Sequence, residues 1–153
     1  MPESAPPSGL IALARTAADA HSLWPELVCA IVEQESSWNP WALRYEPAFY
    51  ERYIAPALAR ASIVTETEAR ARAFSWGLMQ VMGQVARENG FREPSLAALS
   101  DPATGLDIGC RVFNAKLAAA EGNVTRALLL WNGGANPSYP DAVLMRTQRY
   151  ASR

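Results

Sequence analysis

The chain has 153 residues, of which 50% are apolar and 19% charged, a composition that favours one folded domain with a sizeable core over disorder. Its net charge of −1 provides no basic field for nucleic acid or anionic lipid, so neither is an expected partner. A single histidine and two separated cysteines offer no metal-ligand cluster, and we expect no metal site and no cofactor.

The first eight residues are rich in proline, and we expect a flexible N-terminus over residues 1–8 and one folded domain over residues 9–153. This end carries no basic region, and Arg15 interrupts the apolar run from Leu10 to Ala14. It therefore predicts neither a signal peptide nor a membrane span. A packing helix is predicted from Gly9 to about His21, with Ser8 as its cap.

A second helix is predicted to begin at Pro25 and to stop at Asn39-Pro40. It carries three carboxylates on two different faces. Glu26 and Glu33 share one face, on which we expect both to be solvated, whereas Glu35 lies elsewhere.

Glu35 shares an apolar stripe with Val28 and Ile31. Burial disfavours an ionised carboxylate, so this position raises the pKa of Glu35 toward the range in which a carboxylic acid donates a proton near neutrality. The pattern thus favours a general acid. The alternative is that Glu35 only ends the helix, half exposed and paired with an arginine.

The segment from Trp41 to Ile54 is unusually aromatic and carries charges of both signs. Aromatic faces beside polar groups suit sugar rings. The alternative is that Phe49, Tyr50 and Tyr53 are mostly helix-spaced core residues. The next segment, from Thr65 to Ala73, is predicted to be a short, solvated, well-capped helix.

The segment Phe74 to Gly83 is predicted to contain a helix that begins near Gly77 and is capped by Ser75. Gln80 would then lie one turn into that helix, between Met79 and Met82. An amide is a neutral donor and acceptor suited to a polar ligand, whereas methionines at helical spacing are more often core residues.

Three further helices are predicted in the last third of the chain. Asp101-Pro102 begins a long helix that ends near Gly122, and the next one ends at Trp131. The last is amphipathic and covers Tyr139 to Tyr150. Without repeats or linkers, the pattern predicts a single, mainly α-helical domain. The two cysteines fall inside predicted helices and are expected to be buried free thiols, with a disulfide as the alternative, at Cys29 and Cys110.

Four short motifs occur in an order that resembles the soluble lytic transglycosylases of the lysozyme superfamily. They are Glu35-Ser36, Gly77-Leu78-Met79-Gln80, Trp131-Asn132-Gly133 and Tyr139. The resemblance implies a lysozyme-like fold and cleavage of the β-1,4 bond between N-acetylmuramic acid and N-acetylglucosamine in peptidoglycan. It also implies that Glu35 acts first as general acid and then as base, giving 1,6-anhydro ends.

The resemblance also implies which residues bind the substrate. The expected wall of the sugar groove comprises Gln80, Met79 and Met82, and Ser36 follows the acid as a hydrogen-bond partner. Positions near the acid and the glycan are expected at Trp131, Asn132 and Tyr139, with Trp131 standing where the family often has tyrosine. The indole N–H is a donor only. The stretch from Arg44 to Tyr53 resembles that of phage and tail-associated transglycosylases.

Three other functions are compatible with the same motifs. A hydrolytic lysozyme would use water and, if inverting, a second carboxylate, for which Glu46, Glu51 and Asp107 are candidates. A non-catalytic peptidoglycan-binding domain, or a helical interaction module, would need no buried acid.

The protein is expected to act in the periplasm or cell wall. We expect it to be a monomer or a domain of a larger virion or secretion assembly, delivered by a phage or exported by another route.

Overall fold

The computed structural model describes residues 6–151, and helices make up most of that range. The N-terminal elements are α1 (Ser8–Ala20), α2 (Pro25–Ser36), β1 (Leu43–Tyr45), α3 (Pro47–Phe49), the π-helical turn η1 (Tyr50–Ile54) and α4 (Ala55–Ala59). The middle of the chain forms α5 (Glu66–Arg72), β2 (Phe74–Trp76), β3 (Val81–Met82), α6 (Gly83–Glu88) and the 3₁₀ turn η2 (Leu96–Ser100). The chain then forms α7 (Pro102–Ala119), α8 (Val124–Trp131) and α9 (Tyr139–Tyr150).

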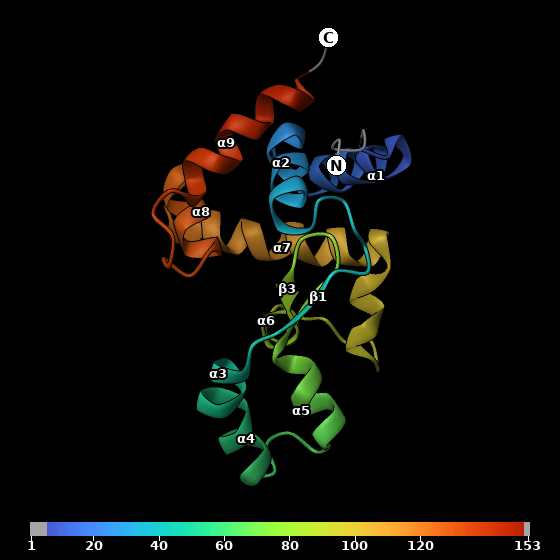
Figure 1. Cartoon of the computed structure of the whole chain (residues 1–153), viewed down its shortest axis with the longest axis vertical. Coiled ribbons are helices and arrows are strands. Elements are labelled where there is room, and N and C mark those ends of the chain that lie inside the picture. Colours follow the sequence, from blue (N-terminus) through green and yellow to red (C-terminus); the bar gives the residue numbers. More distant parts are fainter. Residues whose placement is uncertain (1–5, 152–153) are drawn as a thin grey trace, which may run out of the picture.

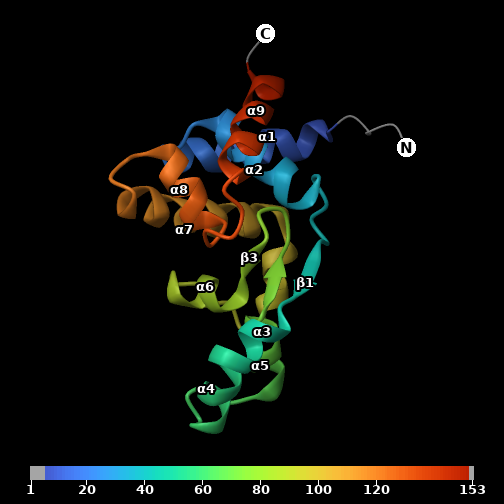
Figure 2. The same ribbon diagram turned by 60° about the vertical axis from the view of Figure 1, so that its left-hand side comes forward.

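The molecule is elongated, with helices at both ends (Figure 1). Helices α1, α2, α7, α8 and α9 gather at one end, and α3, α4 and α5 form the other. An antiparallel sheet of order β1-β2-β3 lies between them (Figure 2). The predicted mainly α-helical, lysozyme-like single domain is confirmed.

Helix α2 is the centre of the larger end. Its residues 27–32 are all buried, and it packs against α1 and α9. The predicted solvation of Glu26 and Glu33 is wrong, because their side chains are only 15% and 12% exposed. Glu26 faces Arg15 of α1, and Glu33 accepts hydrogen bonds from Arg149 and Tyr150 of α9. The neighbouring helices thus cover even the polar face of α2.

The predicted helix at Gly77 is also wrong, because residues 74–82 form a β-hairpin and α6 begins only at Gly83. Ser75 pairs with Met82 across the hairpin, and Gly77 and Gln80 in its turn have positive φ angles of 69° and 51°. The N–H of Gly77 donates to the carbonyl of Ala42, a residue far away in sequence. This contact with the segment before β1 favours the hairpin over a helix.

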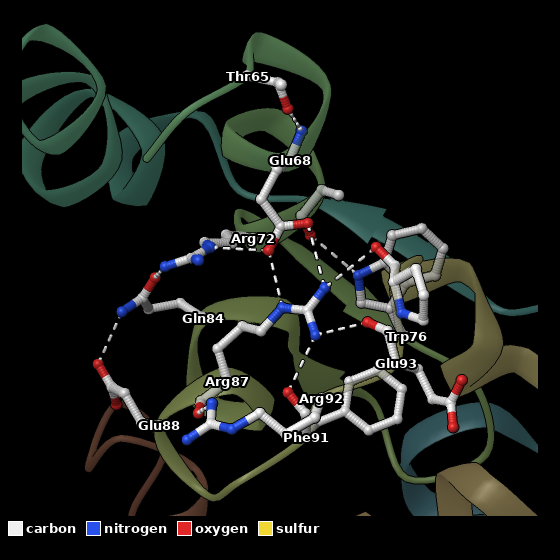
Figure 3. A network of polar contacts seen from close by, with 12 residues as sticks. Thr65, Glu68, Arg72, Trp76, Gln84, Arg87, Glu88, Phe91, Arg92 and Glu93 are labelled. Atoms are coloured by element: carbon white, nitrogen blue, oxygen red, sulfur yellow. Dashed lines mark hydrogen bonds and ion pairs between the residues drawn. The ribbon is translucent and has the colours of Figure 1, made fainter. Parts of the chain in front are cut away.

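The aromatic segment becomes β1, α3 and η1. Of its three rings, Tyr50 is buried in a small hydrophobic cluster and Phe49 packs against that cluster, whereas Tyr53 is 52% exposed. The interpretation of most of these rings as core residues is therefore confirmed for Phe49 and Tyr50 and wrong for Tyr53. Helix α5 is confirmed, with the Thr65 hydroxyl accepting from the N–H of Glu68 at 3.2 Å. That helix is less solvated than expected, because Glu68 also accepts from Arg87 of α6 at 2.7 Å (Figure 3).

The last three helices are confirmed, and α7 and α8 begin with side-chain caps. The Asp101 carboxylate accepts from the N–H of Thr104 at 2.9 Å, and the Asn123 side chain accepts from the N–H of Arg126 at 2.9 Å. Both cysteines are buried and free, and burial raises their pKa to about 11 for Cys29 and about 12 for Cys110.

The remaining expectations concern the N-terminus, membrane-spanning helices and metal-binding groups. The predicted flexible segment falls largely on residues 1–5, which lie outside the described residues, and α1 begins at Ser8. Within residues 6–151, no helix combines the length and the apolar character needed to cross a bilayer. In the same range, no group of three His, Cys, Asp or Glu side chains is arranged to hold a metal ion.

Candidate active site

A groove of about 620 Å³ lies where the last turn of α2 meets the hairpin, α6, α7 and α8. The C-terminal end of α2 supplies Glu35, and the end of α8 supplies Trp131 and Asn132. The hairpin contributes Gln80 and Met82. The groove therefore brings together residues separated by up to 100 positions in the sequence, from Glu35 to Ala135.

Glu35 is held by two side chains that donate to the same oxygen. The indole Nε1 of Trp131 donates to its Oε1 at 3.0 Å, and the hydroxyl of Tyr139 donates to that atom at 2.5 Å. Among residues 6–151, no group donates to Oε2 of Glu35. One oxygen is thus anchored, and the other is the atom left to exchange a proton with a ligand.

The surroundings of Glu35 favour its protonated form. Burial raises the pKa of the Glu35 carboxyl, and this effect outweighs the hydrogen bonds from Tyr139 and Trp131 and the charge of Arg44, all of which lower it. Burial and the adjacent Glu35 carboxylate also raise the pKa of Tyr139, so its hydroxyl remains a donor. Arg44 pairs with Glu46 at 2.9 Å instead of with Glu35.

Gln80 occupies the groove from the tip of the hairpin. Its side-chain Nε2 donates to the carbonyls of Gly77 and Ala42, each at 3.0 Å. The backbone of Gln80 has a positive φ, which residues other than glycine rarely adopt. The two hydrogen bonds of its side chain help to hold the residue in that conformation. The sequence predicted a site residue here and placed it on the wrong type of element.

Ser36 and Met79 lie behind the groove and not on its wall. The hydroxyl of Ser36 donates to the carbonyl of Leu78 at 2.8 Å, which ties the end of α2 to the hairpin. Met79 is 1% exposed and packs against Gly109 of α7, where an added Cβ would collide with its sulfur. Both residues support the groove through contacts with other protein groups.

The groove also has polar residues that the sequence analysis did not single out as binding residues. Arg44 and Glu46 flank Tyr45 at the end of β1, and Ser75 and Lys116 reach the groove from β2 and α7. The period-two spacing of Arg44 and Glu46 is the signal that could have placed them together. Lys116 follows Val112 by one helical turn, so it lies on a face of α7 that is otherwise apolar.

The three carboxylates considered as partners of Glu35 lie in different places. Glu46 lines the groove, although it is paired with Arg44. Asp107 pairs with His21 at 2.7 Å and with Arg111 at 3.4 Å on the surface. Glu51 is exposed on η1 and does not line the groove.

Comparison with known proteins identifies the family of the chain. The model of the transglycosylase SLT domain family matches residues 12–141, a range that contains Glu35 and the hairpin as well as Trp131 and Tyr139. The chain has no significant match to a curated protein or to a solved structure. Because the family match spans most of the 153 residues, the chain belongs to the transglycosylase SLT domain family.

Proposed function

We propose that this protein is a lytic transglycosylase that cleaves the β-1,4 bond between N-acetylmuramic acid and N-acetylglucosamine and leaves 1,6-anhydro ends. Its family acts on peptidoglycan in the cell wall. One observation carries the assignment of the acid: Glu35 lies at the wall of a groove, its pKa is raised by burial, and two neutral donors hold one of its oxygens.

In the first step Glu35 donates its proton to the glycosidic oxygen, and the bond from that oxygen to C1 of the muramic acid breaks. The N-acetyl group of the substrate stabilises the positive charge that develops at C1, so the site needs no second carboxylate as nucleophile. The raised pKa of Glu35 supplies the protonated form that this step requires.

In the second step Glu35, now ionised, takes the proton of the C6 hydroxyl while that oxygen attacks C1. The anhydro ring closes and Glu35 recovers its proton, so the same carboxyl is acid and then base. This step requires the sugar to be held so that its own hydroxyl, and not water, reaches C1. We assign that positioning to Gln80, Met82 and Asn132, which line the groove beside Glu35.

Mass spectrometry of the muropeptides released from purified peptidoglycan tests this proposal. Wild-type protein is expected to release anhydro-muramyl ends, and Glu35→Gln is expected to release none, because an amide cannot donate the proton. Glu51→Gln is the matched control, since that glutamate is exposed outside the groove and should retain full activity. Anhydro ends from Glu35→Gln, or no cleavage by the wild type, would overturn it.

The second candidate function is hydrolysis by an inverting lysozyme, and one observation favours it. Glu46 lines the same groove as Glu35 and could activate a water molecule. Inverting enzymes place their two carboxyl groups about 6.5–9.5 Å apart to make room for that water. Release of reducing ends that disappear in Glu46→Gln would identify this reaction in place of the transglycosylase reaction.

The protein would meet its substrate in the periplasm or cell wall. We propose delivery with a phage particle or within a larger secretion assembly, on the basis of the stretch from Arg44 to Tyr53 and its resemblance to phage transglycosylases. Detection of the protein in purified virions, or in a wall-spanning secretion complex, tests this route.

A further inference from the structure

A second cavity of about 490 Å³ lies beside the groove, between the α3–η1–α4 segment and helices α5 and α6. Val85 of α6 lines both the groove and this second cavity, so the two are adjacent. Phe49 and Tyr53 from the aromatic segment line one wall, and Arg72 and Gln84 line the other. A ligand lying in the groove could therefore extend a substituent past Val85.

The second cavity offers a ligand two aromatic rings and a cation. Phe49 and Tyr53 lie with their ring centroids 5.0 Å apart, and the exposed Tyr53 is on a π-helical turn, a feature frequent at functional sites. Arg60 lies at the rim, and within residues 6–151 its guanidinium makes no hydrogen bond or ion pair. Ser62 adds a hydroxyl.

Arg72, the second arginine of this cavity, is paired with a carboxylate, whereas the Glu88 carboxylate accepts from a neutral amide. Arg72 donates to Glu68 at 3.0 Å and to Gln84 at 3.3 Å, and Gln84 in turn donates to Glu88 at 2.9 Å (Figure 3). This network holds the α6 wall in a fixed arrangement. It leaves Arg60 as the cation with which a ligand of negative charge can pair.

We propose that the second cavity binds the stem peptide of the peptidoglycan strand whose glycan lies in the groove, an inference that rests on the proposed function. The glycan with its amide-linked substituents is uncharged, whereas stem peptides carry free carboxylates. A carboxylate is therefore the complementary partner of Arg60, and the peptide's aliphatic side chains pack on Phe49 and Tyr53. An additional glycan subsite would bind uncharged sugars, which form no ion pair with Arg60.

Two substrates separate these possibilities: intact peptidoglycan strands, and the same strands whose stem-peptide carboxylates have been converted to neutral amides. Removing the peptides with an amidase would not serve, because it frees a carboxylate on each lactyl group. Arg60→Gln is expected to lower kcat/KM on strands with free peptide carboxylates by about three- to fivefold, the change typical of an exposed ion pair, and to leave the amidated strands unaffected. The deficit should shrink as salt is added, because ions screen an exposed pair. Arg126→Gln, which removes an exposed arginine of α8 away from both cavities, should behave as wild type.

Binding of a soluble stem peptide, measured by calorimetry, makes the outcome independent of catalysis. Wild-type protein and Glu35→Gln should bind it equally, and Arg60→Gln more weakly by the same factor. Equal losses on both strands, no loss on either, or unchanged peptide binding by Arg60→Gln would overturn the inference while the transglycosylase activity stands. Peptide binding without any strand cleavage would instead overturn the proposed function alone.

Discussion

Glu35 receives both of its hydrogen bonds on one oxygen, and this asymmetry matters for its chemistry. The donors, Trp131 and Tyr139, come from the end of α8 and the start of α9. Because neither donor is charged, they orient the carboxyl without fixing it in the ionised form, as an arginine partner would. The acid is thus positioned by neutral groups, and burial raises its pKa.

Removing one donor should therefore change the pH profile. In Tyr139→Phe we expect kcat to fall about tenfold, the loss typical of one hydrogen bond to a charged group. The Tyr139 bond lowers the pKa of Glu35, so its loss should raise that pKa further and move the alkaline limb of the kcat profile to higher pH. Muropeptide release measured against pH checks this expectation.

Tyr150→Phe is the matched control for that profile. Tyr150 belongs to the same helix, α9, and its hydroxyl donates to Glu33, a different carboxylate of α2. Its removal should lower the free energy of unfolding without shifting the limb. If the alkaline limb of the kcat profile moved equally in both variants, or in neither, the assigned effect of Tyr139 on the pKa of Glu35 would be wrong.

At the scale of elements, the hairpin of β2 and β3 decides the shape of the groove. Its turn places Gln80 in the groove, and Ser36 ties it to the end of α2 through the Leu78 carbonyl. Gly77 begins that turn with φ of 69°, and its backbone lies against η2. A Cβ at this position would lie 2.5 Å from the carbonyl oxygen of Leu99.

Gly77→Ala should accordingly be severely destabilising. A left-handed alanine costs about 1 kcal/mol, and the collision with the Leu99 backbone adds to it, so we expect a loss of about 3 kcal/mol or more in the free energy of unfolding. Urea denaturation measures this difference. Gly122→Ala is the control, because Gly122 has φ of 80° and open space around it, and should cost only about 1 kcal/mol. If the two variants lost the same free energy of unfolding, the collision with Leu99 would not contribute to the effect of Gly77→Ala.

At the scale of the whole molecule, the Glu68 carboxylate links the end formed by α3, α4 and α5 to helix α6. Glu68 of α5 accepts from Arg72 of its own helix and from Arg87 of α6, and Arg87 also donates to the carbonyls of Phe91 and Glu93 (Figure 3). Although burial acts to raise it, the hydrogen bonds from the two arginines hold the pKa of Glu68 below its usual range.

Glu68→Gln should thus lower the free energy of unfolding by about 1–2 kcal/mol at neutral pH. Because the folded-state pKa of Glu68 is lowered, its contribution is fully present above the unfolded pKa of about 4.3 and is lost as the pH falls through the folded value. Thermal unfolding at a series of pH values should show the gap between variant and wild type closing on acidification.

Glu66→Gln provides the comparison within the same helix. Glu66 is exposed and lies 3.6 Å from Arg70, a surface pair of small expected effect. Its unfolding curve should follow that of the wild type at every pH. A gap for Glu68→Gln that stayed constant on acidification would exclude the charged pairing as its cause.

The sequence by itself determined the features that depend on near neighbours in the chain. Caps at Thr65, Asp101 and Asn123 act within three residues, and apolar stripes act over one or two helical turns, so the helices they specify could be predicted. The motif around Glu35 likewise singled out that carboxyl before any contact was known.

Only the tertiary structure decided the features that depend on distant segments. The hairpin follows from a contact between Gly77 and Ala42, and the burial of Glu33 from the docking of α9. The partners of Glu35 lie 96 and 104 residues away in the sequence. Pairing across such distances is set by whichever side chains fold against a group, and local periodicity does not specify those partners.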